Sequence, residues 1–317
     1  MILNDFLILN EQGYYCKYGD FYIDAKVAVN VNLVSHAHAD HARPGSKNVY
    51  TTSPSIDFMK YRYGNNAAKV FMPVEFNSVF ELNGVQIQFI KAGHMLGSAQ
   101  ILMLYKGVRY LYSGDIKLQE DHSCEKVEFV QCDVLITETT FAYPEVIHPK
   151  VESEIQNLLN YTQPIVIGTY ALGKAQRLSS LCKQYVPDVP LYIHYDILPY
   201  HKIYQKHNYL NWEHSLLQKK DIRQGRHGIY LVPPLTYQSY KAQYSYTFAF
   251  ASGWSNLQEH KHKLYVSDHL DWPDLLEYIK HCAPQEIWTI HGESKHLIAH
   301  FGSSNIKVKE INNEGRN

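Results

Sequence analysis

The sequence lacks the features that would place this chain in a membrane or in a disulfide-bonded secreted protein. No run of 18 apolar residues occurs among its 317 positions, so no membrane span is expected. The first residues do not combine a basic region with an apolar stretch, so no secretion signal is expected. The five cysteines form no Cys-x-x-Cys pair, and they indicate the reduced thiols of a cytoplasmic protein.

Net charge is also nearly absent, at −1, which alone argues against a general nucleic-acid-binding protein. The charges are unevenly distributed, however. Residues 160–265 contain 12 Lys and Arg against 5 Asp and Glu, whereas the rest of the chain contains 18 against 26. The middle segment is therefore either a phosphate-facing surface or a basic face without a partner. Several of the 26 tyrosines lie among these cations, where their rings would either stack on the bases of a single strand or pack half-buried.

What the chain does contain is a dense cluster of metal-ligand residue types. The segment Ser-His-Ala-His-Ala-Asp-His, residues 35–41, places His36, His38, Asp40 and His41 directly after an apolar, strand-like run. Neutral imidazole and carboxylate suit zinc and similar divalent metals. Side chains two positions apart on an extended chain point the same way, so His36 and His38 can bind one ion together. A turn and then a helix would carry Asp40 and His41 toward a second position.

Three further potential ligands follow, each at the end of a strand-like run and each beside a glycine. They are His94 after Gly93, Asp115 after Gly114, and His291 before Gly292. Glycine lets the backbone approach a metal closely. Each of the three alone would be an ordinary core or loop residue, but together with residues 35–41 they predict a metal centre.

On these motifs the chain resembles the metallo-β-lactamase superfamily over nearly its whole length. The resemblance implies two divalent metal ions, with zinc expected and manganese as the alternative. It implies a first ion bound by His36, His38, His94 and Asp115, and a second bound by Asp40, His41, Asp115 and His291, with Asp115 bridging. Asp24 resembles the superfamily's first motif, a carboxylate that orients a ligand histidine.

Two further residues narrow the resemblance to the β-CASP branch, whose members cut nucleic-acid phosphodiesters and carry an inserted cap. Glu138 follows a strand-like run, and His269 lies in Ser-Asp-His-Leu-Asp-Trp before a predicted helix. Several stretches resemble the bacterial ligase-associated DNA exonuclease group in particular. They are residues 41–45, 61–64, 97–100, 170–177, 252–254 and 267–273.

The order of predicted elements fits an α/β fold with an insertion. Residues 1–160 and 250–317 are predicted to form the metallo-β-lactamase domain, an αββα sandwich of two sheets between helical layers. Residues 161–249 open with a strand–helix–strand pattern and are predicted to form the inserted α/β β-CASP cap.

The predicted chemistry is a two-metal attack of hydroxide on the phosphodiester. Two ions can share a water and lower its pKa to about 7. Asp40 is assigned to the catalytic group, and His269 is the predicted proton donor to the leaving oxygen, oriented by Glu138. The Glu138–His269 pair could instead brace the domain junction. The candidate phosphate- or nucleic-acid-binding residues, which could also be simple surface groups, are Lys174, Arg177, Ser252 and Gly253.

The leading prediction is a DNA exonuclease that works in DNA repair beside a DNA ligase. The first alternative is an RNA-processing nuclease of the mRNA 3′-end-processing kind. His291 keeps it open, because Artemis-type DNA nucleases usually lack this histidine, whereas RNA-processing relatives and the ligase-associated group have it. The insertion and the Glu138–His269 pair argue against a small-molecule metallo-hydrolase. The retention of all seven ligands argues against a non-catalytic subunit that only binds nucleic acid.

Overall fold

The computed structural model describes residues 1–211, 214–254 and 262–311, and these divide into two compact units. Unit 1 comprises the described residues of 1–120, 124–147 and 269–317, and unit 2 those of 121–123 and 148–268. The expected limits of the insertion were residues 161 and 249. The units divide elsewhere because the segments that flank those limits pack with the sheet of unit 2.

Unit 1 contains two sheets. Within the described residues, sheet A has the strand order β1-β2-β3-β4-β5-β6, which are Ile8–Asn10, Gly13–Cys16, Phe21–Ile23, Val31–Leu33, Ser46–Thr51 and Ala68–Pro73. Sheet B has the order β19-β18-β11-β10-β9-β8-β7, which are Lys307–Glu310, Glu286–Gly292, Val134–Thr139, Val108–Tyr112, Ala99–Tyr105, Val85–Lys91 and Val79–Leu82.

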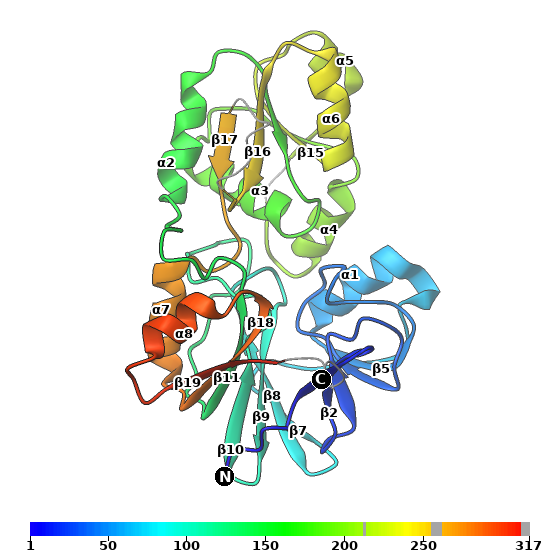
Figure 1. Ribbon diagram of the computed structural model, residues 1–317. Coiled ribbons are helices and arrows are strands. Elements are labelled where there is room, and N and C mark those ends of the chain that lie inside the picture. The colour runs from blue at the N-terminus through cyan, green and yellow to red at the C-terminus, as the bar shows by residue number, and fades with distance from the viewer. Residues whose placement is uncertain (212–213, 255–261, 312–317) are drawn as a thin grey trace. The chain divides into compact units, whose positions relative to one another are not determined.

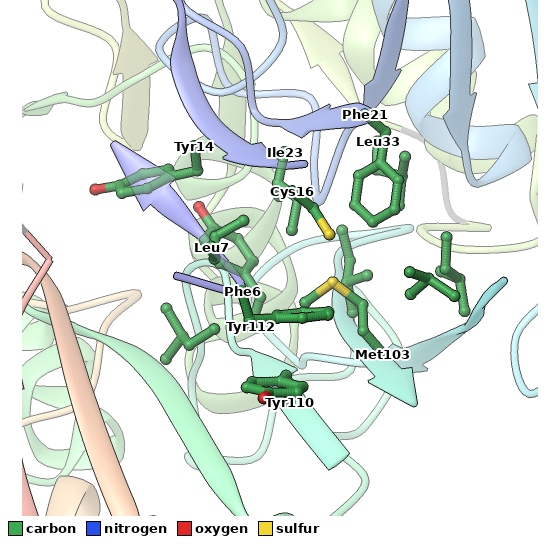
Figure 2. Close-up of a cluster of buried hydrophobic side chains, with 14 of the residues drawn as sticks. Phe6, Leu7, Tyr14, Cys16, Phe21, Ile23, Leu33, Met103, Tyr110 and Tyr112 are labelled. Carbon is green, nitrogen blue, oxygen red and sulfur yellow. The ribbon is translucent and has the colours of Figure 1, made fainter. Parts of the chain in front are cut away.

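The two sheets of unit 1 pack face to face through a shared apolar core (Figure 2). Alternate residues of β8, namely Val85, Ile87 and Phe89, are buried in this core, as the two-residue period of a strand requires. At one end of the core the ring of Phe6 stacks on that of Tyr110, with their centroids 3.7 Å apart. The sequence alternation thus fixes which face of each strand meets the other sheet.

Helices cover the outer faces of both sheets of unit 1. They are α1 (Ser53–Tyr63), η1 (Gly64–Asn66), α7 (Trp272–Cys282) and α8 (Lys295–Phe301). Met59 of α1 packs with Val49 of sheet A, and Leu275 of α7 packs with Ile287 of sheet B. Asp271 caps α7 by accepting a hydrogen bond from a first-turn backbone N–H at 3.0 Å. The result is the αββα sandwich predicted from the sequence.

Unit 2 contains sheet C, whose paired strands run parallel. Its order within the described residues is β14-β13-β15-β12-β16-β17, which are Ser215–Leu216, Leu191–Ile193, Ile229–Val232, Ile165–Gly168, Thr247–Ser252 and His262–Tyr265. The helices are α2 (Val151–Gln156), η2 (Asn157–Asn160), α3 (Lys174–Tyr185), α4 (Leu198–Lys206), α5 (Lys219–Arg223) and α6 (Pro234–Gln243).

Helices pack against sheet C in unit 2 (Figure 1). Two separate apolar cores lie between these helices and the sheet. Ile155 of α2 and Leu178 of α3 lie in one core, and Tyr237 of α6 lies in the other. This three-layer α/β arrangement is the kind expected for the insertion. No helix in the described part of the chain is long and apolar enough to cross a membrane.

Candidate metal centre

Four predicted ligands converge in unit 1. His36, His38, His94 and Asp115 each contribute one ligand atom to a group in which all atoms lie within 4.8 Å of one another. Nε2 of His94 is 3.1 Å from Nδ1 of His38 and 3.7 Å from Oδ2 of Asp115. Nε2 of His36 is 3.5 Å from the same carboxylate oxygen. These are the residues that the resemblance assigned to the first ion.

The strand ends and their glycines place these side chains. His36 and His38 follow β4 in a turn that closes with a hydrogen bond from the Ala42 N–H to the His38 carbonyl, 2.8 Å; the expected helix does not follow this turn directly. Gly93, before His94, has φ +74, and a Cβ there would lie 2.7 Å from the Lys117 carbonyl oxygen. Only glycine fits this close approach without a backbone shift.

Asp24 holds the second half of the motif in place. Its carboxylate accepts hydrogen bonds from Nδ1 of His41 at 2.8 Å, from the Ser35 N–H at 2.7 Å and from the Tyr112 hydroxyl at 3.0 Å. With Nδ1 engaged, Nε2 of His41 lies 3.4 Å from Oδ1 of Asp115. Ser35 and Tyr112 were not anticipated. Their positions could have indicated this role, because Ser35 immediately precedes the first histidine and Tyr112 ends a buried strand.

The predicted second ligand set is less tightly gathered. Oδ2 of Asp40 is 3.8 Å from Nε2 of His41, and the ring of His291 is 5.6 Å, centre to centre, from that of His41. Asp40 and His291 are exposed, whereas His41 and Asp115 are buried. Across residues 1–211, 214–254 and 262–311, this set does not bring all its ligand atoms within 4.8 Å.

The electrostatics of the cluster suit a cation. Burial, reinforced by the neighbouring histidines, lowers the pKa of His36 well below its usual value, so this ring is neutral and offers an electron pair. Its buried Nε2 makes no hydrogen bond to any described residue. Burial raises the pKa of Asp115 to about 6 against the pull of His41. Burial lowers the pKa of His41, but Asp115 and Asp24 outweigh burial and raise it to about 10. The neutral ring of His36 beside the Asp115 carboxylate fits a divalent metal, and His41 would bind one once an ion displaced its proton.

His269 and Glu138 form a second polar pair beside this cluster. Nδ1 of His269 is 2.7 Å from Oε2 of Glu138 and 4.0 Å from Oδ2 of Asp115. The other carboxylate oxygen of Glu138, Oε1, accepts a hydrogen bond from the Ile116 N–H at 3.0 Å. The His269 side chain is 28% exposed, whereas Glu138 is buried. Asp115, Glu138 and His269 also bring ligand atoms within 4.8 Å of one another, so this trio is an alternative metal-binding group.

The predicted phosphate-binding residues lie in unit 2, and both cations are buried there in ion pairs. Nζ of Lys174 is 2.9 Å from Oδ2 of Asp268, and a guanidinium nitrogen of Arg177 is 3.1 Å from Oδ1 of the same carboxylate. The carbonyl of Gly253 lies 3.2 Å from Nε2 of His148, and Oγ of Ser252 accepts from the Trp254 N–H at 3.2 Å. Phosphate binding by these four residues stays a prediction.

Comparison with known proteins indicates which protein family the chain resembles. The family model of the zinc-dependent metallo-hydrolase RNA specificity domain matches residues 257–301. The chain is 25% identical over 300 residues to a probable DNA ligase of Opitutus terrae, covering 88% of this chain and 28% of that protein. It is 29% identical over 218 residues to an RNase J-like protein of Methanocaldococcus jannaschii, covering 58% and 51%. It is 31% identical over 199 residues to the endoribonuclease ysh1 of Aspergillus fumigatus, covering 50% and 23%.

The chain therefore spans between about a quarter and a half of the length of these relatives. Among solved structures, a protein of unknown function from Enterococcus faecalis V583 superposes with a TM-score of 0.58 at 13% identity, over 83% of this chain and 75% of that one. That likeness concerns the fold alone. The two-sheet sandwich, the histidine–aspartate cluster at its strand ends and the relatives together support a place for the chain in the metallo-β-lactamase superfamily, in its β-CASP branch.

Proposed function

We propose that this chain is a metal-dependent nuclease that hydrolyses phosphodiester bonds. The observation that carries the proposal is the convergence of His36, His38, His94 and Asp115 beside the Glu138–His269 pair. Phosphodiester hydrolysis needs a neutraliser of phosphate charge and a proton for the leaving oxygen. The first group suits a cation and the second suits proton transfer. Relatives named as an RNase J-like protein and an endoribonuclease support this reaction class.

The residues that would hold the metals are those of the two ligand sets, with zinc as the proposed ion. His36, His38, His94 and Asp115 would bind the first ion, and Asp40, His41, Asp115 and His291 would bind the second. When bound, divalent ions supply Lewis acidity toward the phosphate and lower the pKa of water. Asp24 keeps Nε2 of His41 directed at Asp115 by engaging Nδ1.

His269 is proposed to donate the proton to the leaving oxygen. Its Nδ1 is held by Glu138 at 2.7 Å, so Nε2 is the nitrogen that would transfer the proton. A carboxylate at this distance stabilises the imidazolium that a general acid requires. Glu138 acts as a positioning residue, because its other oxygen is anchored by the Ile116 N–H.

DNA is the proposed substrate, cut from an end during repair in association with a DNA ligase. The match to the probable DNA ligase spans 88% of this chain, whereas those to the RNase J-like protein and the ysh1 endoribonuclease span 58% and 50%. RNA is the second candidate. It is favoured by the RNA specificity domain match over residues 257–301, which include His269 and His291.

The test uses linear DNA and RNA of one sequence, labelled separately at the 5′ and 3′ ends, and a closed single-stranded DNA circle. Protein stripped with a chelator is reconstituted with Zn²⁺ or Mn²⁺. Stepwise shortening of linear DNA with an intact circle is the expected result. Faster degradation of RNA favours the second candidate, and cutting of the circle contradicts an exonuclease. The Asp115→Asn variant, purified in parallel, controls for contaminating nuclease. A metal-loaded wild-type protein that cuts neither polymer refutes the proposal.

A further inference from the structure

We infer that the carboxyl end of sheet C binds the unpaired bases of a single nucleic-acid strand, by stacking them on Tyr170, Tyr195 and Trp254. The inference rests on the proposed function and deepens it, because it names single-stranded nucleic acid as the form of substrate that unit 2 recognises. The three rings come from three strands of one sheet, within one compact unit.

The parallel topology brings these rings to one edge. Each is the second residue after its strand: Tyr170 follows β12, Tyr195 follows β13 and Trp254 follows β16. All the paired strands of sheet C run parallel, so their carboxyl ends meet at the same edge (Figure 1). Leu235, the third residue after β15, lies at that edge as well. Each of the four neighbouring strands β13, β15, β12 and β16 is thus followed by a large hydrophobic side chain.

These side chains are more exposed than the other aromatic side chains that the structure describes in unit 2. Tyr170, Tyr195 and Trp254 are 62%, 63% and 50% exposed, and Leu235 is 88% exposed. Tyr204 and Tyr237, by contrast, are fully buried and serve packing. Among its described residues, the tyrosine-rich segment therefore contains buried, half-buried and exposed rings. Large hydrophobic groups gathered at the surface indicate an interaction site.

The backbone at the same edge carries partial positive charge, which attracts the negatively charged phosphates of a nucleic acid. Helices α3, α4 and α6 follow β12, β13 and β15, so their N-termini begin at this edge, and none carries an acidic residue in its first turn. Helix N-termini carry partial positive charge. Lys202, exposed on α4, adds a full charge. Two acidic groups also lie here, and both face a basic side chain: Asp268, after β17, is 2.9 Å from Nζ of Lys174, and Oδ2 of Asp196 is 3.4 Å from Nδ1 of His194.

The spacing of the strands matches a short strand of bases. Neighbouring strands lie roughly 4.8 Å apart, so the three spacings from β13 to β16 cover roughly 14 Å. Five stacked nucleotides, separated by four steps of about 3.4 Å, cover the same length. Aromatic rings bind bases regardless of sequence, because every base has a π-face. Rings together with a positive edge therefore fit unpaired bases and their phosphates.

The test measures binding separately from cleavage, with the full-length protein in EDTA. A fluorescent 12-nucleotide oligothymidylate and an abasic oligomer of the same length are titrated, and the anisotropy is followed. Tyr170→Ala, Tyr195→Ala and Trp254→Ala should each weaken oligothymidylate binding by about 5- to 100-fold. Binding of the abasic oligomer should not change, because it offers no bases to stack.

Conservative variants and a matched control separate stacking from other effects. Tyr195→Phe should keep wild-type affinity, whereas Tyr195→Leu, which keeps apolar bulk, should lose it. Phe129→Ala removes an aromatic side chain of unit 1 that is 44% exposed, and it should leave binding unchanged. Thermal unfolding of each variant checks that it folds. Quenching of tryptophan fluorescence by the oligomer should shrink in Trp254→Phe.

The outcomes separate this inference from the proposed function. If the wild-type protein binds and cuts nucleic acid but the alanine variants bind both oligomers with wild-type affinity, the stacking surface is refuted and the nuclease proposal stands. An equal loss on both oligomers also refutes stacking. A wild-type protein that neither binds an oligomer nor cuts after metal reconstitution refutes both.

Discussion

Two buried carboxylates, one in each unit, have opposite surroundings. In unit 2, Asp268 is paired with an ammonium at 2.9 Å and a guanidinium at 3.1 Å, contributed by Lys174 and Arg177. In unit 1, Asp115 forms its ion-pair contacts, among the described residues, with histidines alone. They are His36, His41, His94 and His269, each with a ring nitrogen within 4.0 Å of a carboxylate oxygen.

The difference separates a structural ion pair from a ligand site. A buried carboxylate is costly unless its charge is compensated. The chain compensates Asp268 with its own cations, and the resulting network joins α3 to the segment after β17. Around Asp115 it supplies mainly electron-pair donors, which a divalent cation can bridge. The negative charge of Asp268 is therefore balanced by cations of the chain itself. The surroundings of Asp115 suit balance by a bound ion.

Removal of the Asp115 carboxylate should have the largest effect on activity. Asp115→Ala deletes the one residue common to both proposed ligand sets, so bound metal and turnover should both be lost. The loss should exceed the roughly 10²–10⁴-fold that a general acid contributes. Metal content by elemental analysis and cleavage of end-labelled DNA measure the two effects. A variant that keeps both metals and cuts normally would show that Asp115 is no ligand.

Removal of the His269 ring should reduce turnover while leaving metal in place. His269→Ala is expected to lose about 10²–10⁴-fold in kcat, because the leaving oxygen no longer receives a proton. A substrate with sulfur in place of the leaving oxygen needs no such proton, and it should recover most of the rate. Loss of metal would instead assign His269 to the group formed with Asp115 and Glu138. Retained metal without recovery on the sulfur substrate would make its role positioning.

The sequence predicted more of unit 1 than of unit 2. Strand-like runs were expected at His36, His94, Asp115 and His291, and β4, β8, β10 and β18 lie there, because local apolar patterns and glycines define such strand ends. The convergence of His36, His38, His94 and Asp115 was implied by a family resemblance, since no local pattern relates positions so far apart in sequence.

The burial of Lys174 and Arg177 shows why the rest could not be predicted. Two cations at a helix start after a glycine have the local pattern of a phosphate site. Their pairing with Asp268 depends on a contact between residues about 90 positions apart. The unit boundary between residues 147 and 148 could not be predicted for the same reason. Val151 and Ile155 form an ordinary apolar helix face in the sequence, and only the fold shows that this face packs against α3.

The Asp268 network should matter for stability where Asp115 matters for chemistry. Asp268→Asn removes the carboxylate beside the buried ammonium of Lys174 and leaves the guanidinium of Arg177 with Asp121, 3.7 Å away. Breaking a buried ion pair from one side costs about 3–5 kcal/mol of unfolding free energy. Asp115→Asn in EDTA should cost less, because Asp24 still holds His41 and the desolvation penalty of one carboxylate is relieved. Urea unfolding of the full chain compares them. An equal cost for both variants would remove the distinction between the two carboxylates.

The smallest expected effect concerns His201, a fully buried histidine of unit 2. Its ring nitrogens lie 3.1 Å from the Gln176 amide nitrogen and 3.0 Å from the Ser179 hydroxyl. Burial, reinforced by His214, lowers its pKa to about 3, so the folded state keeps the ring neutral. Its contribution to stability is therefore complete above the unfolded-state pKa near 6.5, and it is lost as pH falls toward 3.

The expected slope is about 1.4 kcal/mol of unfolding free energy per pH unit between pH 6 and 4. His201→Gln should remove this slope, measured by urea unfolding in EDTA so that metal release does not contribute. His227→Gln, at an exposed position of the same unit, is the matched control and should leave the slope in place. If His201→Gln retains the full wild-type slope, the loss of stability in acid originates in the histidine cluster of unit 1. The ion-paired charges of unit 2 then do not respond to mild acid.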